Sequence, residues 1–223
     1  QVYELWAQIY PREDRAVGNL GLLYGFIGQY DKGLSQAQEA LLLHPESGLR
    51  YANLVQNYIR VNRLEDAETV SREALAKNLD TPFLRLYLYQ LAFLRGDRSG
   101  MAEQITWAAG KPGVEDIFLA VEADTAAHSG QLKNAREFTR QAVASAMRVG
   151  AKETAACYEA AASIRESLFG NFTDALQRVE AGRTLSTSRD VTFAAALALA
   201  LSGKEAQSQK LATELADRFS QDT

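Results

Sequence analysis

A short phrase recurs along the chain at nearly constant intervals, and this period constrains the fold more than any other feature of the sequence. The phrase opens on glycine or asparagine, and most copies close on a small residue. It begins at Gly28, Asn62, Gly96, Gly130, Gly170 and Gly203. The interval is nearly the same each time, except for a longer one between Gly130 and Gly170. A period of about 34 residues is typical of solenoids, in which each supersecondary unit is stacked on the next.

Each repeat reads as two helices separated by this phrase. Apolar residues in the first repeat recur at spacings of three and four on both sides of Gly28, as in amphipathic helices. They are Val17, Leu20 and Tyr24 before the break, and Leu34, Ala37, Ala40 and Leu41 after it. Glycine suits the break because a helix often ends on a residue with left-handed backbone angles, which asparagine also tolerates. Asn62 therefore fits the pattern.

The small residues that close several copies predict close contact between the two helices of a hairpin. They are Gly33, Ala67, Ala135 and Ala175. Six extra residues lie between Gly130 and Gly170, where the sequence has little loop character. We expect them to lengthen two helices, between them, by roughly a turn, since a turn takes about 3.6 residues.

The spacing Val17-x-x-Leu20-Gly21-x-x-Tyr24, followed by Gly33, Ala37, Ala40 and Pro45, resembles the tetratricopeptide repeat. The second copy keeps Tyr51, Leu54, Tyr58, Ala67, Ser71 and Ala74. Later copies depart from the pattern, and the fifth has Glu166 at the place of Tyr24. The resemblance implies an all-α fold, a right-handed α-solenoid of about six and a half helix-turn-helix repeats.

The period also predicts the domain organisation, one solenoid domain over residues 1–223. Residues 1–13 are expected to form the second helix of a truncated repeat. The full repeats are expected at about 14–47, 48–81, 82–115, 116–155, 156–188 and 189–222.

The two ends of the chain differ in character. The last helix carries an apolar stripe of Leu211, Leu215 and Phe219 among charged residues, which is typical of a capping helix with a wet outer face. The first helix has a wide apolar face, which includes Trp6. We expect residues upstream of Gln1, so that this chain is a piece of a longer protein.

Residues 3–76, beginning Tyr3-Glu4-Leu5-Trp6-Ala7-Gln8-x-Tyr10-Pro11-Arg12, are similar to the tetratricopeptide tail of some bacterial serine/threonine protein kinases. None of the kinase motifs occurs in this sequence. The resemblance implies a docking or sensory segment, with catalysis located elsewhere.

Composition excludes several classes of function. The formal net charge of −4 over 223 residues offers no basic footprint, so nucleic acid is not an expected partner. Apolar runs stay short of the ~20 residues that a membrane helix needs, so membrane insertion by this segment is not expected. The single cysteine, Cys157, cannot form an internal disulfide. A cytoplasmic location is favoured, and an extracytoplasmic one would follow if a membrane anchor preceded Gln1.

Catalytic motifs do not occur in the sequence. His44 and His128 are the only histidines and lie far apart in the chain, which disfavours a metal site. Cys157 lies among alanines, where a small buried side chain is expected. The sequence has neither a Gly-x-Ser-x-Gly elbow nor a phosphate loop. We therefore expect a protein without catalytic residues, metal or cofactor.

The family resemblance implies that the first helix of each hairpin lines a concave groove. By register, the candidate partner-binding residues are Asn19, Leu22, Phe26, Asn53, Gln56, Arg60, Tyr87, Gln90, Asp124 and His128. Amide side chains suit peptide main chains because each offers a donor and an acceptor. Arginine and tyrosine are enriched at binding hot spots.

One function of the family is disfavoured, the clamp that grips the C-terminal carboxylate of chaperones. It needs lysine, asparagine and arginine at set places on the groove helices, and here those places hold Gly18, Leu22, Asn53, Phe83 and Tyr87. Only Asn53 agrees, and the missing cations remove the charge complement of a carboxylate.

Two hypotheses for the function stand beside each other. The first is a non-catalytic interaction module that binds a peptide or protein partner in the groove. It would be the docking or regulatory part of a larger bacterial multidomain protein such as a kinase. The alternative is a structural self-assembly element, with self-association through the apolar N-terminal helix.

Overall fold

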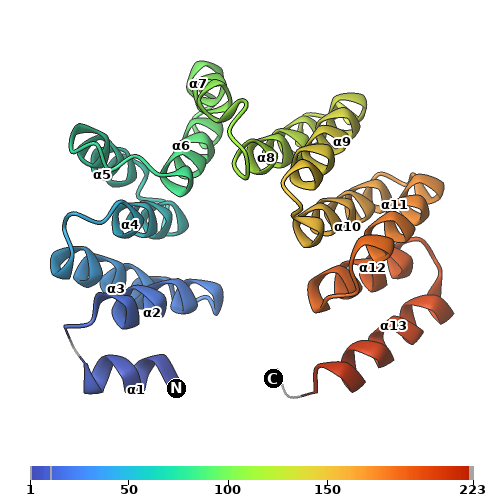
Figure 1. Ribbon diagram of the computed structural model, residues 1–223, viewed down its shortest axis with the longest axis horizontal. Coiled ribbons are helices and arrows are strands. Elements are labelled where there is room, and N and C mark those ends of the chain that lie inside the picture. Colours follow the sequence, from blue (N-terminus) through green and yellow to red (C-terminus); the bar gives the residue numbers. More distant parts are fainter. Residues whose placement is uncertain (1, 11, 221–223) are drawn as a thin grey trace. The chain divides into compact units, whose positions relative to one another are not determined.

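The computed structural model describes residues 2–10 and 12–220, with the side chain of Asp14 excepted, and this part of the chain forms thirteen α-helices. The all-α fold is therefore confirmed. The chain divides into two compact units, residues 1–107 and 108–223 (Figure 1). In unit 1 the helices are α1 (Val2–Ile9), α2 (Asp14–Phe26), α3 (Tyr30–Leu43), α4 (Gly48–Arg60), α5 (Leu64–Ala76), α6 (Pro82–Leu94) and α7 (Arg98–Ala108). In unit 2 they are α8 (Glu115–His128), α9 (Leu132–Arg148), α10 (Lys152–Leu168), α11 (Phe172–Leu185), α12 (Arg189–Leu201) and α13 (Glu205–Arg218).

The turns inside the hairpins are built as the repeated phrase predicts. Gly28 has φ +79° and Asn62 has φ +57°, both in the left-handed region. The amide of the residue after each turn donates back to a carbonyl in the preceding helix, as in Gln29 N to Tyr24 O at 2.8 Å and Arg63 N to Tyr58 O at 2.9 Å. These bonds satisfy carbonyls that the end of a helix leaves free.

Close packing within the first hairpin depends on glycine. A Cβ added to Gly33 would lie 2.8 Å from Asn57 Oδ1 and 3.0 Å from the carbonyl oxygen of Gly21. A Cβ on Gly21 would in turn lie 3.1 Å from the carbonyl oxygen of Gly33. Helices α2 and α3 therefore approach closely because neither residue has a side chain, as the small closing residues predict.

The cores of the two units differ in the size of their side chains. In unit 1, α4 supplies Tyr51, Leu54 and Val55 to one continuous cluster that extends onto α3, α5 and α6. In unit 2 alanines dominate, as in the cluster of Ala156, Ala160, Val191 and Ala194 between α10 and α12. Apolar burial thus follows the seams between neighbouring helices.

The long interval between Gly130 and Gly170 is accommodated within helices. Helices α9 and α10 each contain 17 residues, whereas α8 and α11 on either side contain 14. Two helices are lengthened, as expected, but each gains nearly a turn, whereas the sequence predicts about one turn shared between them. Because Gly150 ends α9 with φ +74°, α10 begins at Lys152, ahead of the predicted start of that repeat at 156.

The helices form a lone helix, α1, followed by six antiparallel hairpins, which matches the six and a half repeats that the sequence predicts. Within α13 Leu211 is buried, and Leu215 and Phe219 beside its end are half-buried, with most other side chains exposed. Its amphipathic character is that of the predicted capping helix. That residues 1–223 form one continuous domain remains a prediction.

Across the described residues, no helix is long and apolar enough to span a lipid bilayer.

Candidate functional site

The first helices of the three complete hairpins of unit 1 lie next to one another, with α4 in contact with both α2 and α6. We call the surface that carries the predicted binding residues of these helices the α2–α4–α6 face. It comprises Asn19, Leu22 and Phe26 on α2, Asn53, Gln56 and Arg60 on α4, and Tyr87 and Gln90 on α6.

Three predicted residues on α4 share an unusual property. The side chains of Asn53, Gln56 and Arg60 follow a spacing of three and four, so they line one stripe of the helix. Each has a buried polar atom without a hydrogen-bond partner in the described part of the chain: Asn53 Nδ2, Gln56 Oε1 and Arg60 Nη1. Asn57 on the same helix has one as well, as do Asp116, Arg183 and Ser188 in unit 2. Asn53 is only 5% exposed. Buried polar groups in proteins are almost always paired, so this stripe lacks the partners it needs.

Arg60 also connects α4 to α2. Its guanidinium lies over the Phe26 ring, with Cζ 5.1 Å from the ring centroid, a cation–π arrangement. The Phe26 ring is itself 74% exposed. A Cβ added to Gly25 would lie 1.9 Å from Arg60 Nη1, so the guanidinium occupies space that only glycine leaves open.

Tyr87 completes the face from α6 and is buried, with 7% of its surface exposed. Burial raises the pKa of its phenol, and the positive charge of Arg60 acts in the opposite direction. The Tyr87 side chain belongs to the core cluster of unit 1.

The other predicted residues are less closely linked. Asn19, Leu22 and Gln90 are half-buried on α2 and α6. Asp124 and His128 lie on α8 in unit 2 and are exposed, and Asp124 is already ion-paired with Arg165 of α10. Among the predicted residues, the structure therefore brings Phe26 into contact with Arg60, and it places Asn53 and Gln56 along the same helix as Arg60.

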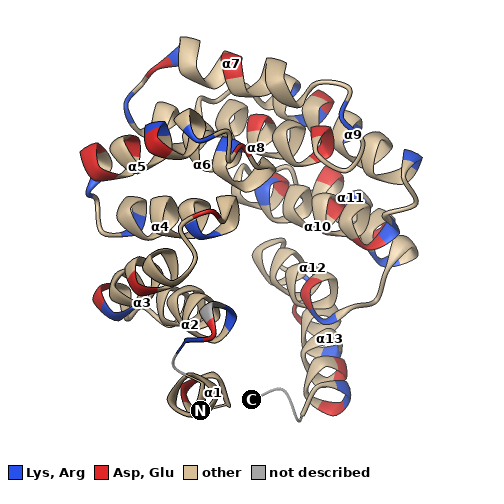
Figure 2. Ribbon diagram, turned by 60° about the vertical axis from the view of Figure 1, so that its left-hand side comes forward, with Lys and Arg blue, Asp and Glu red and all other residues tan. Residues whose placement is uncertain are grey.

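Positive and negative side chains are interspersed along the described helices, and no band of lysine and arginine is visible (Figure 2). Lysine and arginine segments alternate with aspartate and glutamate segments along the helices (Figure 2). Many of these charges are paired at short range, as in Arg63 with Asp66 at 2.8 Å and Arg85 with Asp80 at 2.9 Å. Arg60 differs from these paired arginines.

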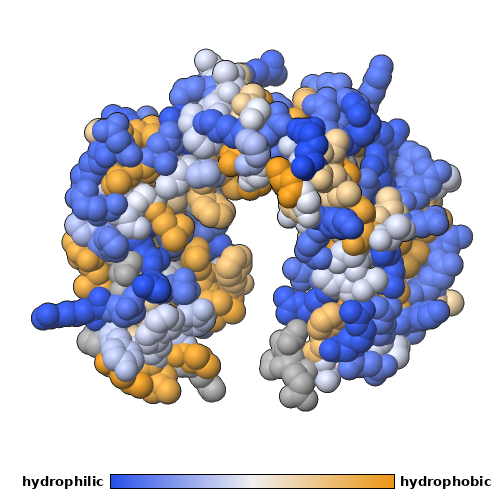
Figure 3. Space-filling model, viewed as in Figure 1, coloured by the Kyte–Doolittle hydropathy of each residue, from blue (hydrophilic) through white to orange (hydrophobic). Residues whose placement is uncertain are grey.

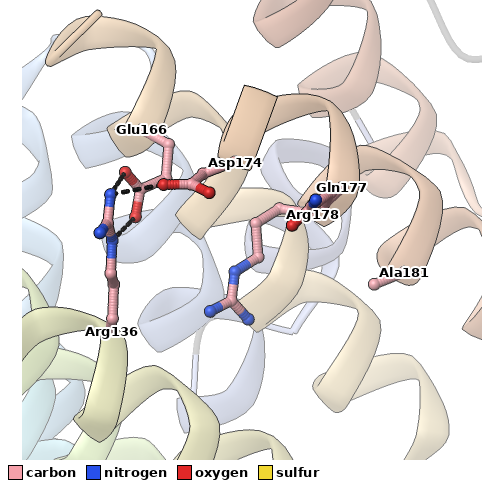
Figure 4. Close-up of a pocket in the computed structure, with 6 residues that line it drawn as sticks. All are labelled: Arg136, Glu166, Asp174, Gln177, Arg178 and Ala181. Atoms are coloured by element: carbon pink, nitrogen blue, oxygen red, sulfur yellow. Dashed lines mark hydrogen bonds and ion pairs between the residues drawn. The ribbon is translucent and has the colours of Figure 1, made fainter. Parts of the chain in front are cut away.

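A second polar cluster lies in unit 2, between α9, α10 and α11 (Figure 4). Arg136 donates to both carboxylate oxygens of Glu166 at 2.7 Å and to Asp174 Oδ2 at 2.7 Å. Asn171 Nδ2 donates to Glu166 Oε2 at 3.0 Å. A cavity of about 260 Å³ beside these residues is also lined by Gln177, Arg178 and Ala181.

This second cluster is internally satisfied. Burial opposes ionisation of Glu166, yet the hydrogen bonds from Arg136 and Asn171 outweigh it and lower the pKa of the carboxyl. Arg178 in turn donates to Glu159 at 2.8 Å. Since its acids and bases already neutralise one another, the cluster joins neighbouring hairpins. Its one sequence signal is Glu166 at a position where the first two repeats have tyrosine.

The residues considered for catalysis do not form a constellation. His44 is exposed at the end of α3. Burial raises the pKa of the half-buried Cys157 thiol, and the negative charges of Glu153 and Asp190 raise it further. A thiol with a raised pKa is a poor nucleophile. In the part of the chain that the structure describes, no three His, Cys, Asp or Glu side chains are grouped to hold a metal ion.

Regularly repeated hairpins with left-handed turns define a tetratricopeptide-type α-solenoid, and solved structures share this fold. The chain is similar to that in the crystal structure of the APC/C hetero-tetramer Cut9-Hcn1, with a TM-score of 0.59 at 14% identity over 94% of this chain and 44% of that one. It is also similar to PilW, described as a widely conserved type IV pilus biogenesis factor, with a TM-score of 0.55 at 16% identity over 92% and 93% of the two chains. Both are tetratricopeptide-repeat proteins. This chain spans less than half of the first of them.

No family model matches the sequence, and no curated protein does.

Proposed function

We propose that this chain is a non-catalytic protein-interaction module that holds a peptide segment of its partner on the α2–α4–α6 face. The observation that carries the proposal is the stripe of Asn53, Gln56 and Arg60, whose buried polar atoms have no partner among the described residues. Leaving a buried donor or acceptor unsatisfied costs about 1–3 kcal/mol. A ligand that supplies the missing partners recovers this free energy, so its binding is favoured.

An extended peptide suits these groups better than a helix does. Main-chain N–H and C=O groups of an extended segment are free to pair, whereas those of a helix are already bonded to one another. An amide side chain matches both, since it donates through one atom and accepts through the other.

Peptide selection from a displayed library, followed by titration of the selected peptides, tests the proposal. Replacing Arg60 by alanine together with Tyr87→Phe should weaken binding at unchanged helical content, because both side chains belong to the face and phenylalanine keeps the buried ring volume of Tyr87. The matched control is Arg72→Ala, which removes an exposed arginine from α5, the other helix of the same hairpin. Unchanged affinity in the double variant would show that the α2–α4–α6 face does not bind the peptide.

The exposed surface of α1 favours a second candidate, self-assembly. Val2, Leu5 and Ile9 are 79%, 57% and 58% exposed, and their spacing of three and four puts them on one side of the helix. Figure 3 shows hydrophobic surface gathered over α1. Light scattering over a concentration series measures self-association, and Leu5→Ser should abolish it. A strictly monomeric wild-type chain would count against this candidate.

We also propose that the module is the docking part of a larger bacterial protein, such as a serine/threonine kinase with a tetratricopeptide tail. The support is the resemblance of residues 3–76 to such tails. Reading the coding sequence upstream of Gln1 tests it, and a start codon directly before this segment would contradict it.

A further inference from the structure

We propose that the α2–α4–α6 face recognises an acidic peptide, with an internal aspartate or glutamate side chain bound to the Arg60 guanidinium. The proposal rests on the proposed function, because it names the class of peptide that the face would take. Two observations carry it. Arg60 Nη1 has no hydrogen-bond partner among the described residues, and neither do Asn53 Nδ2 and Gln56 Oε1 on the same helix.

The first step is the lack of a counter-ion. Arg63 and Arg85 in the same unit have carboxylate partners, as does Arg95 with Glu68. Arg60 is half-buried, its Nη1 has no partner among the described residues, and its guanidinium contacts the Phe26 ring. A guanidinium that has been partly removed from water without an anion gains most from a planar carboxylate, which it can bind with two parallel hydrogen bonds.

The second step is that Arg60 is held in place without being neutralised. The Phe26 ring supports one side of the guanidinium, and Gly25 leaves room for Nη1 against the backbone of α2. Both contacts position the charge, and neither supplies a hydrogen-bond acceptor to Nη1. Preorganisation of this kind lowers the entropy that binding costs.

The third step sets the length of the recognised segment. From Asn53 to Arg60 the helix rises about 1.5 Å per residue, about 10 Å in all. An extended chain advances about 3.3 Å per residue, so this distance corresponds to about three residues of peptide. With the carboxylate on Arg60, a peptide residue about three positions away therefore lies level with Asn53 along α4.

The surroundings of Arg60 favour an internal acidic residue over a C-terminal carboxylate. The Phe26 ring beside Arg60 is 74% exposed, and the same end of α2 and the turn after it also expose Leu23 at 41% and Ile27 at 65%. This surface can support further residues of the ligand on the far side of the carboxylate. The recognised sequence is therefore an acidic residue flanked on one side by apolar residues.

Fluorescence polarisation with defined peptide pools tests the proposal on the whole chain. The probes are N-acetylated, C-amidated nonapeptide pools with glutamate fixed at the centre, and the same pools with glutamine there. We expect the glutamate pool to bind at least tenfold more tightly, and we expect Arg60→Gln to abolish this preference. Gly25→Ala should reduce the preference while retaining the charge, because the new Cβ displaces Nη1; Arg72→Ala should leave it unchanged.

The outcomes separate the two proposals. Equal binding of the two pools to the wild-type chain would overturn the acidic-peptide proposal and leave peptide binding on this face intact. Binding only of peptides with a free C-terminal carboxylate would also overturn it, in favour of recognition of a chain end. Absence of binding by every pool, at concentrations where a library-selected peptide binds, would overturn it as well. Failure to select any peptide would instead refute the proposed function itself.

Discussion

Removal of Arg136 should destabilise unit 2 much more than neutralisation of its partner Glu166. The Glu166 side chain is 3% exposed, whereas that of Arg136 is 40% exposed. Arg136→Ala therefore leaves a buried carboxylate with only Asn171 as a donor, while Glu166→Gln leaves a half-exposed guanidinium that keeps Asp174. The asymmetry follows from which member of the pair is left without a partner in a buried place.

The magnitude follows from the same geometry. Removal of one member of a fully buried ion pair costs about 3–5 kcal/mol. Because solvent reaches Arg136 and screens the pair, we discount this to about 2–3 kcal/mol for Arg136→Ala. Glu166→Gln loses a charge-assisted bond but buries no charge, and should cost about 1 kcal/mol. Adding Glu166→Gln to Arg136→Ala should restore part of the loss, since the unpaired charge is removed.

The effect depends on pH in a defined direction. The pKa of Glu166 in the folded chain is lowered below its ordinary value of 4.5. Its contribution to stability is therefore fully present above the unfolded pKa, and it is lost as the pH falls through the folded pKa. In Arg136→Ala the buried carboxyl is protonated more readily on acidification. The stability difference between wild type and this variant should shrink from pH 7 toward pH 4.

Hydrogen exchange of the amides in α9, α10 and α11 is the suitable assay. Both tryptophans, Trp6 and Trp107, lie in unit 1, so their fluorescence does not report on this region. Repeat arrays also open locally, which makes a local measurement preferable to one global transition. Equal losses in Arg136→Ala and Glu166→Gln, or a difference independent of pH, would refute the reasoning.

Three further outcomes follow from single residues. Gly33→Ala should cost about 1–3 kcal/mol in thermal or denaturant unfolding, because the new Cβ meets the carbonyl oxygen of Gly21 at 3.0 Å; wild-type stability would show that α2 and α3 separate freely. At Asn62, φ +57°, alanine should destabilise by about 1 kcal/mol and glycine should be tolerated, and a variant series ranked the other way would contradict the left-handed turn. Cys157 should react with a disulfide reagent at pH 7 more slowly than free cysteine, since burial raises its pKa; reaction at the rate of a free thiol would count against that environment.

The architecture could be predicted from the sequence because its determinants are local and repeated. A glycine or asparagine in each repeat, with apolar residues at spacings of three and four, specifies where each helix ends and which side it buries. Asn62 and Gly28 have the backbone angles that this pattern requires. In the structure α10 begins at Lys152, a few residues before the repeat boundary that the sequence predicts at about 156.

The binding face could be predicted only in part. Register along the chain indicated Asn53, Gln56 and Arg60 on one side of a helix, since periodicity determines which residues share a face. Periodicity does not determine which charged side chains form ion pairs. Arg60 lies over Phe26 and has no carboxylate partner among the described residues, while Asp124, also predicted as a binding residue, is ion-paired with Arg165.

The sequence alone determined the number of hairpins, the left-handed turns between their helices and the face that each helix buries, because these depend on residues within one repeat. Only the tertiary structure decided which charges are neutralised. Glu166 and Arg136 belong to different hairpins, as do Arg60 and Phe26. Whether a charge finds a partner depends on how neighbouring hairpins bring such distant side chains together, and on how far burial has removed them from water.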